Sequence, residues 1–160
     1  MPGIGINGQV TEVTQLSRSA DYSTAAAVLG DDSGGPIDIY TAATGSVVAG
    51  SLNEFISSSA LSGNGSTMLV DGTDVVDPAT GSLAGTISGA SGGNAALNAA
   101  GTTGYSLNGS SITELDIATL STGPTIALPD PASGGEALAM APDGGYLVAG
   151  TTGGAAIVKL

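Results

Sequence analysis

The chain has 160 residues, 27 of them glycine and only 3% aromatic, and its 14 carboxylates outnumber two basic residues to give a formal net charge of −12. Nucleic acids and anionic membranes are bound largely through Lys and Arg, so a chain with two cations is not expected to bind either. Because the sequence has no Cys and no His, it excludes thiol chemistry, Ser–His nucleophiles and the commonest transition-metal ligands.

The chain begins MPGIGINGQV, a stretch with neither basic residues nor an apolar core, so we expect no signal peptide. No stretch reaches the ~18 consecutive apolar residues of a membrane-spanning helix. The apolar residues instead form many short runs between Gly-rich turns, which is typical of strands. The length fits a single domain, residues 1–160.

Four segments of the chain share one turn. It occurs around Gly8, Gly45, Gly81 and Leu120, which follow one another at intervals of 37, 36 and 39 residues. Each repeat is expected to hold a weak strand rich in Ala and Ser, an apolar strand, a third strand after a turn, and a fourth strand after a TATG-like turn. In chain order the expected strands are 9–16, 20–24, 26–29, 37–40, 46–51, 59–61, 67–70, 74–77, 82–88, 95–98, 104–107, 112–116, 122–128, 136–140, 145–148 and 155–160.

This repeat predicts the fold class. Four strands in about 38 residues are typical of one propeller blade, so we expect an all-β chain that forms a β-propeller of four four-stranded blades. The weak first strand of each repeat fits this arrangement, because small side chains suit a strand that lines a crowded axis.

Two turn motifs connect the repeats with a known family. Asp77-Pro78-Ala79-Thr80-Gly81 has the pattern D-x-A-T-G, residues 116–120 have it except at the last position, and Ala141-Pro142-Asp143-Gly144 belongs to an A-x-x-P-D-G-like turn. The chain therefore resembles YVTN-type β-propeller repeat proteins over nearly its whole length. The resemblance implies the propeller fold and no particular activity, because propellers host many functions.

The two ends of the chain are expected to meet. Residues 9–16 follow an Asn-Gly turn, as the fourth strand of each repeat follows a turn. The last repeat stops at its third strand, 155–160. We expect the N-terminal strand to complete the C-terminal blade, which would remove two exposed strand edges. Two assemblies satisfy this count: a closed four-bladed ring of one chain, and an eight-bladed ring in which two chains exchange the N-terminal strand.

Acidic residues in corresponding turns of the first two blades are the candidate metal ligands: Asp31, Asp32, Asp71 and Asp74. Oxygen ligands on turns suit Ca²⁺. Asp also shapes turns by accepting hydrogen bonds from nearby backbone, and this role is the alternative. The sequence offers no catalytic residue and no ligand for an organic cofactor, so we expect no enzyme.

The function expected from these features is a non-enzymatic structural or protein-interaction propeller. Its partners would be other protein subunits, with self-association as one form of this. The composition resembles that of virion components such as capsid-decoration or tail-associated proteins, which would place the chain on a virion. The alternative is a secreted or cell-surface binding module such as a lectin, in which the four tyrosines would stack on sugars: Tyr22, Tyr40, Tyr105 and Tyr146.

Overall fold

The structure is a computed structural model of the chain, and it describes residues 13–29, 34–132 and 137–160. Fifteen β-strands account for the regular structure of these residues. They are β1 (Val13–Arg18), β2 (Thr24–Leu29), β3 (Pro36–Thr41), β4 (Ser46–Ser51), β5 (Ser59–Leu61), β6 (Met68–Val70), β7 (Asp74–Asp77), β8 (Ser82–Thr86), β9 (Asn94–Leu97), β10 (Thr103–Asn108), β11 (Ser111–Asp116), β12 (Ser121–Ala127), β13 (Leu138–Met140), β14 (Tyr146–Thr151) and β15 (Gly154–Lys159).

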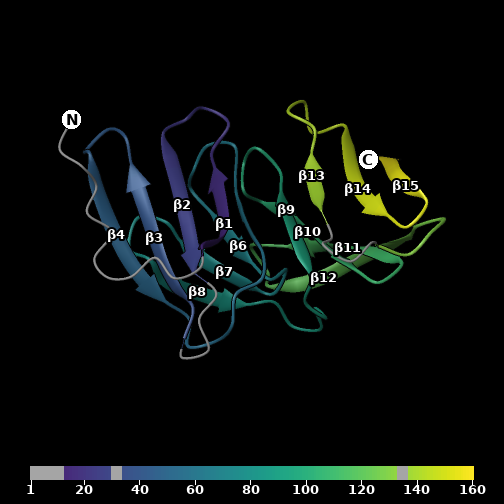
Figure 1. Cartoon of the computed structure of the whole chain (residues 1–160), viewed down its shortest axis with the longest axis horizontal. Coiled ribbons are helices and arrows are strands. Elements are labelled where there is room, and N and C mark those ends of the chain that lie inside the picture. The colour runs from purple at the N-terminus through teal and green to yellow at the C-terminus, as the bar shows by residue number, and fades with distance from the viewer. Residues whose placement is uncertain (1–12, 30–33, 133–136) are drawn as a thin grey trace.

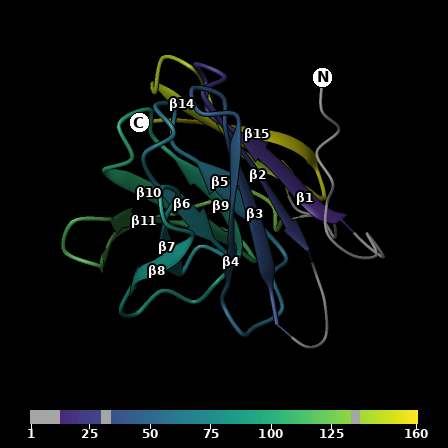
Figure 2. The same ribbon diagram turned by 90° about the vertical axis from the view of Figure 1, so that its left-hand side faces the viewer.

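The strands form four small antiparallel sheets, arranged as the four blades of a β-propeller (Figure 1). Blade 1 is β1–β4, blade 2 is β5–β8, blade 3 is β9–β12 and blade 4 is β13–β15, and within each blade the strands are ordered as in the sequence. Blades 1 and 4 lie at opposite ends of the arc in Figure 1, and the view of Figure 2 brings blade 1 to the front. The first strands of neighbouring blades lie next to each other at the axis.

The four-strand repeat is confirmed. The expected strands 46–51, 59–61 and 74–77 coincide with β4, β5 and β7, and those from 26–29 onward differ from the observed strands by at most three residues at an end. Such differences are the normal uncertainty of strand ends. The period therefore corresponds to one blade, as expected.

The start of blade 1 differs from the prediction. The expected inner strand 20–24 was wrong, because residues 20–23 form a turn and the inner position belongs to β1, which places Leu16 opposite Ala27 of β2. Residues 13–16 of the expected N-terminal strand thus belong to blade 1 and do not complete blade 4, whose described part has three strands. Residues 9–12 of that expected strand lie outside the described residues.

Hydrogen bonds explain why residues 20–23 turn. The Asp21 carboxylate accepts hydrogen bonds from Ser19 Oγ (2.7 Å) and from the Ser23 backbone N–H (2.9 Å). An Asp that binds the backbone two residues further on stabilises a turn and competes with a strand. Asp21 therefore makes this segment the connection between β1 and β2.

The D-x-A-T-G motif forms the turn between the third and fourth strands. In blade 2 the Asp77 carboxylate accepts hydrogen bonds from the Ala79 N–H (2.9 Å) and the Thr80 hydroxyl (3.1 Å), and Gly81 follows with φ = 68°. The last position requires a left-handed backbone, which glycine adopts without strain. In blade 3 Leu120 takes this position with φ = 52°.

The hydrophobic core consists of three clusters, one at each junction between neighbouring blades. Their buried members include Ile39 and Met68 between blades 1 and 2, Leu69 and Leu115 between blades 2 and 3, and Leu107 and Leu147 between blades 3 and 4. Because strand side chains alternate between faces, each internal blade supplies one face to each of two clusters. The blades are therefore held together mainly by apolar packing.

Candidate functional site

The first strands of the four blades line a groove of about 360 Å³. Most of its lining is Ala, Ser or Gly, drawn from the ends of β1, β5, β9 and β13 and the turns that follow them. The larger side chains in the lining are Arg18, Leu61, Leu97, Leu138, Met140 and Pro142. Small side chains at the axis, expected from the Ala- and Ser-rich strands, thus leave a groove between the blades.

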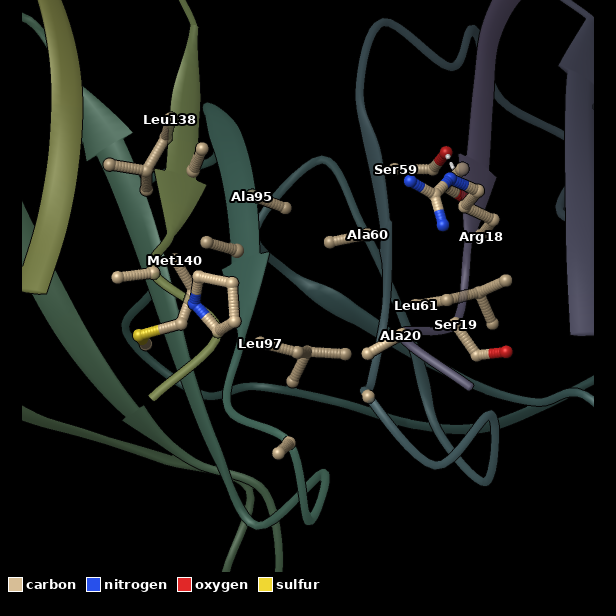
Figure 3. A pocket seen from close by; sticks show the side chains of 17 residues that line it. Arg18, Ser19, Ala20, Ser59, Ala60, Leu61, Ala95, Leu97, Leu138 and Met140 are labelled. Carbon is tan, nitrogen blue, oxygen red and sulfur yellow. Dashed lines mark hydrogen bonds between the residues drawn. The ribbon is translucent and has the colours of Figure 1, made fainter. Parts of the chain in front are cut away.

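Arg18 supplies the charge in this groove. It is the one ionisable side chain among the lining residues, and its guanidinium lies 4.2 Å from the centroid of the Tyr22 ring. Stacking on an aromatic ring orients a guanidinium and leaves its N–H groups at the edge free to bind an anion. Figure 3 shows Arg18 and Ser19 on one side of the groove, with Leu138 and Met140 on the other.

Hydrogen bonds fix the wall that carries Arg18. The Ser59 backbone N–H donates to Gln15 Oε1 (3.0 Å), and the Ser59 hydroxyl donates to Ser17 Oγ (3.4 Å). These contacts join β1 to β5 across the boundary between two blades. The cation is therefore held on a strand that is tied to its neighbour.

The hydroxyl–carboxylate pair beside the groove is structural. Ser19 is buried, and its oxygen also accepts a hydrogen bond from the Thr24 N–H (3.0 Å). The hydrogen bond from the Ser19 hydroxyl, followed by those from Ser23, lowers the pKa of Asp21 to about 2. A carboxylate with so low a pKa is a weak base, so this arrangement does not activate Ser19 as a nucleophile.

The calcium hypothesis concerned four residues, of which the structure describes two. Asp31 and Asp32 lie outside the described residues. Asp71 Oδ1 accepts hydrogen bonds from the Ser57 N–H (2.9 Å), the Ser57 hydroxyl (2.8 Å) and the Ser58 N–H (2.7 Å), so it ties the loop before β5 to the turn after β6. In the described parts of the chain no group of three or more acidic side chains is placed to hold a metal ion. Calcium binding stays a prediction.

Asp74 lies in an arrangement that the sequence did not indicate. It is buried, its Oδ1 atom has no hydrogen-bond partner, and its carboxyl group faces Glu54 from the loop between β4 and β5. A hydrogen bond with Asp74, then desolvation and the charges of Asp74 and Asp71, raise the pKa of Glu54 to about 7. The two residues lie 20 positions apart, one in the loop between blades 1 and 2 and the other in blade 2, and no local pattern joins them.

No helix in the described residues is long and apolar enough to cross a membrane.

Comparisons with known proteins identify the fold and no family. No protein-family model and no curated protein sequence matches the chain. Among solved structures, a chain of "Kuenenia stuttgartiensis Hydrazine Synthase" is similar with a TM-score of 0.73 and 18% identity, over 99% of this chain and 49% of that one. A chain of "Crystal Structure of Mitotic Checkpoint Complex" is similar with a TM-score of 0.70 and 21% identity, over 92% of this chain and 46% of that one. This chain thus spans about half the length of the β-propeller chains that it matches, and it shares the WD40-like propeller architecture with them.

Proposed function

We propose that this chain is a non-catalytic protein-interaction module whose central groove binds an extended segment of a partner protein. The observation that carries the proposal is the groove at the first strands, with Arg18 as its cation. Propellers are typical protein-interaction scaffolds, and the similarity to propeller structures supports a function of this class.

The strands around the groove suit an extended partner. In each sheet the first strand has one hydrogen-bonded neighbour, so the other edge of β1, β5, β9 and β13 faces the axis without a partner strand from its own sheet. Such edges offer backbone donors and acceptors to an added strand. The small side chains of Ala60, Ala95 and Ala139 let a partner backbone come close.

The charge of the groove selects the partner's chemistry. Arg18 is one of two cations in a chain of net charge −12, and it lies among apolar and small side chains. A guanidinium binds a carboxylate through paired hydrogen bonds. We therefore expect the partner segment to place an Asp or Glu beside small apolar residues.

A peptide array tests this proposal. The labelled protein is applied to an array of synthetic decapeptides of varied sequence, and we expect the bound peptides to be enriched in one acidic residue next to small apolar ones. Arg18→Ala should lose most of this binding, because a carboxylate would then lie in the groove without its cation.

Lys159→Ala is the matched control, since it removes the other cation from a strand outside the groove and gives the same net charge. Equal binding by the original protein and Arg18→Ala, or no peptide bound above the level of an unrelated protein, would refute the proposal.

Three more specific hypotheses remain: a role in virions, a relation to YVTN-type repeats, and the lectin alternative. A role in virions and the relation to YVTN-type repeats are supported by composition and turn motifs, and they stay predictions. The lectin alternative requires exposed aromatic rings at the same position in successive blades, but Tyr105 is buried in the core between blades 3 and 4, and the register of blade 4 places Val148 at the same position. This pair supports packing between blades in preference to sugar stacking.

A further inference from the structure

The two outermost sheet faces of the arc are uncovered. We call the face of a blade that points toward the next blade its forward face, and the opposite one its rear face. The forward face of blade 4 carries Tyr146, Val148, Ile157 and Lys159. The rear face of blade 1 carries Leu16, Arg18, Ala27, Asp38, Tyr40 and Val47. Figure 1 shows these two blades at opposite ends of the molecule.

The repeat shows that the forward face of blade 4 is a junction surface. The forward face of blade 3 carries Tyr105, Leu107 and Ile112, which are 6%, 0% and 0% exposed beneath blade 4. Equivalent turn bonds, Asn98 N–H to Thr103 O in blade 3 and Ala141 N–H to Tyr146 O in blade 4, place Val148 at the position of Tyr105. On this face of blade 4, Tyr146, Val148 and Ile157 are 41%, 40% and 72% exposed. Side chains of junction type thus lie on a face that no described blade covers.

The rear face of blade 1 also exposes apolar side chains. Leu16 is 78% exposed at the inner strand, and Val47 is exposed at the outer strand. The rear faces of blades 2 and 4 also carry apolar side chains, among them Met68 and Leu147, but there the preceding blade buries them. Exposed apolar side chains gathered on one face are typical of an interaction surface.

We propose that a second copy of this chain covers both faces, so that the forward face of blade 4 of each copy packs on the rear face of blade 1 of the other. Two such identical junctions close a ring of eight blades with twofold symmetry. The arc matches about half of a larger propeller chain, which is the curvature that such a ring requires.

The charges of the two faces favour a head-to-tail junction over a junction between two identical faces. The forward face of blade 4 carries the sole lysine, Lys159, opposite Tyr146 in the strand pair. The rear face of blade 1 carries Asp38 between Ala27 and Ala49 of the neighbouring strands. The same face carries Arg18 opposite Ala25, so in a head-to-tail junction this lysine meets a face with one carboxylate and one cation, whereas forward faces packed together would oppose two lysines and no carboxylate.

The second copy would also complete the groove. The four first strands line it from one side, and a partner arc would bring four more strands and a second Arg18 to the same axis. The test of this inference measures the mass of the assembly, whereas the proposed function is tested by peptide binding.

Light scattering of the full chain tests the proposal. We expect a mass of twice 15.1 kDa at micromolar concentration. Ile157→Asp and Leu16→Asp should each give a single-copy mass, because each buries a charge at both junctions. Leu83→Asp is the control, since Leu83 is also an exposed apolar strand residue but belongs to the internal blade 2; it should leave the mass doubled.

Mixing the two monomeric variants separates head-to-tail from other pairings. The Leu16→Asp copy keeps its forward face and the Ile157→Asp copy keeps its rear face, so the mixture should form a weaker heterodimer through one intact junction. Lys159→Glu and Asp38→Lys should each weaken the dimer, and the double variant should restore it. Circular dichroism and a cooperative melt establish that each variant is folded.

Two results would overturn the proposal. A single-copy mass for the original chain would mean that something other than a second copy covers these faces, such as further blades of a longer chain. A dimer that Leu16→Asp leaves intact would mean that copies associate through a different surface.

Discussion

At the scale of single residues, Glu54 beside Asp74 has the most perturbed carboxyl group among the described residues. Asp74 is buried, and Glu54 shares a proton with it by hydrogen bonding, which raises the pKa of Glu54 to about 7 from an ordinary value of 4.5. Two carboxylates this close cannot both ionise freely. The folded protein therefore retains a proton that the unfolded chain releases.

We predict that this pair makes the protein less stable as the pH rises. Between pH 4.5 and about 7 the folded state binds more protons than the unfolded state, so the free energy of unfolding falls with pH across this window and levels off above it. Urea unfolding at a series of pH values measures the slope.

Glu54→Gln should flatten this slope, because the amide keeps a donor for Asp74 but does not ionise. The control is Asp143→Asn, which removes an exposed acid of the turn before β14 and should leave the slope unchanged. An identical slope in Glu54→Gln and the original protein would contradict the assignment of the proton to this pair.

At the scale of elements, glycine decides how closely neighbouring blades approach. Gly50 in β4 lies against the backbone of Gly81 in the turn between β7 and β8, and a β-carbon at position 50 would overlap the Gly81 carbonyl. Backbone cannot rotate away as a flexible side chain does. The close approach of blades 1 and 2 at their outer edge thus requires glycine.

We predict that Gly50→Ala destabilises the protein by about 1–3 kcal/mol, the usual cost of overpacking. For a chain of this length each kcal/mol corresponds to roughly 2–4 °C in the melting temperature. Differential scanning calorimetry measures the shift.

Gly145→Ala is the matched control, because a β-carbon there would meet only the Asp143 side chain at ordinary contact distance, and we expect a change within about 0.5 kcal/mol. Equal melting temperatures for the two variants would show that blades 1 and 2 do not meet at Gly50.

The elements also show what the sequence can and cannot predict. β7 was predictable because an Asp-Gly-Thr turn precedes it and a D-x-A-T-G turn follows it, and β4 was predictable because it follows a TATG-like turn. The place of β1 was missed because a strand next to the N-terminus can pair with either blade 1 or blade 4, and local pattern does not decide between them. The turn at Asp21 had a signal, since Asp is a turn former, but the Ala-rich run after it suggested a strand.

The candidate site was only partly predictable for a similar reason. Ala- and Ser-rich first strands indicated a crowded axis, and their convergence on a groove follows from the propeller architecture. Arg18 faces the groove only because β1 takes the inner position, and Glu54 meets Asp74 only because the loop between β4 and β5 lies against β7. Contacts of this kind depend on tertiary structure, which repeats alone do not specify.

At the scale of the whole molecule, charge and packing oppose each other. Fourteen carboxylates and two cations give a net charge of −12, and self-repulsion of this size weakens a compact state. Three apolar clusters between the blades resist it. The stability of the protein should therefore depend on how strongly salt screens its acids.

We predict that added NaCl raises the melting temperature at pH 8. The screening length falls from about 10 Å at 0.1 M to about 3 Å at 1 M, which removes most repulsion between exposed carboxylates. The control is the same salt series near the isoelectric point of about 4.1, where little net charge remains and the melting temperature should change much less. Salt also strengthens apolar packing at both pH values, so the difference between the two series isolates the charge effect. Equal salt responses at the two pH values would show that packing between the blades, and not repulsion among the acids, sets the salt dependence of the fold.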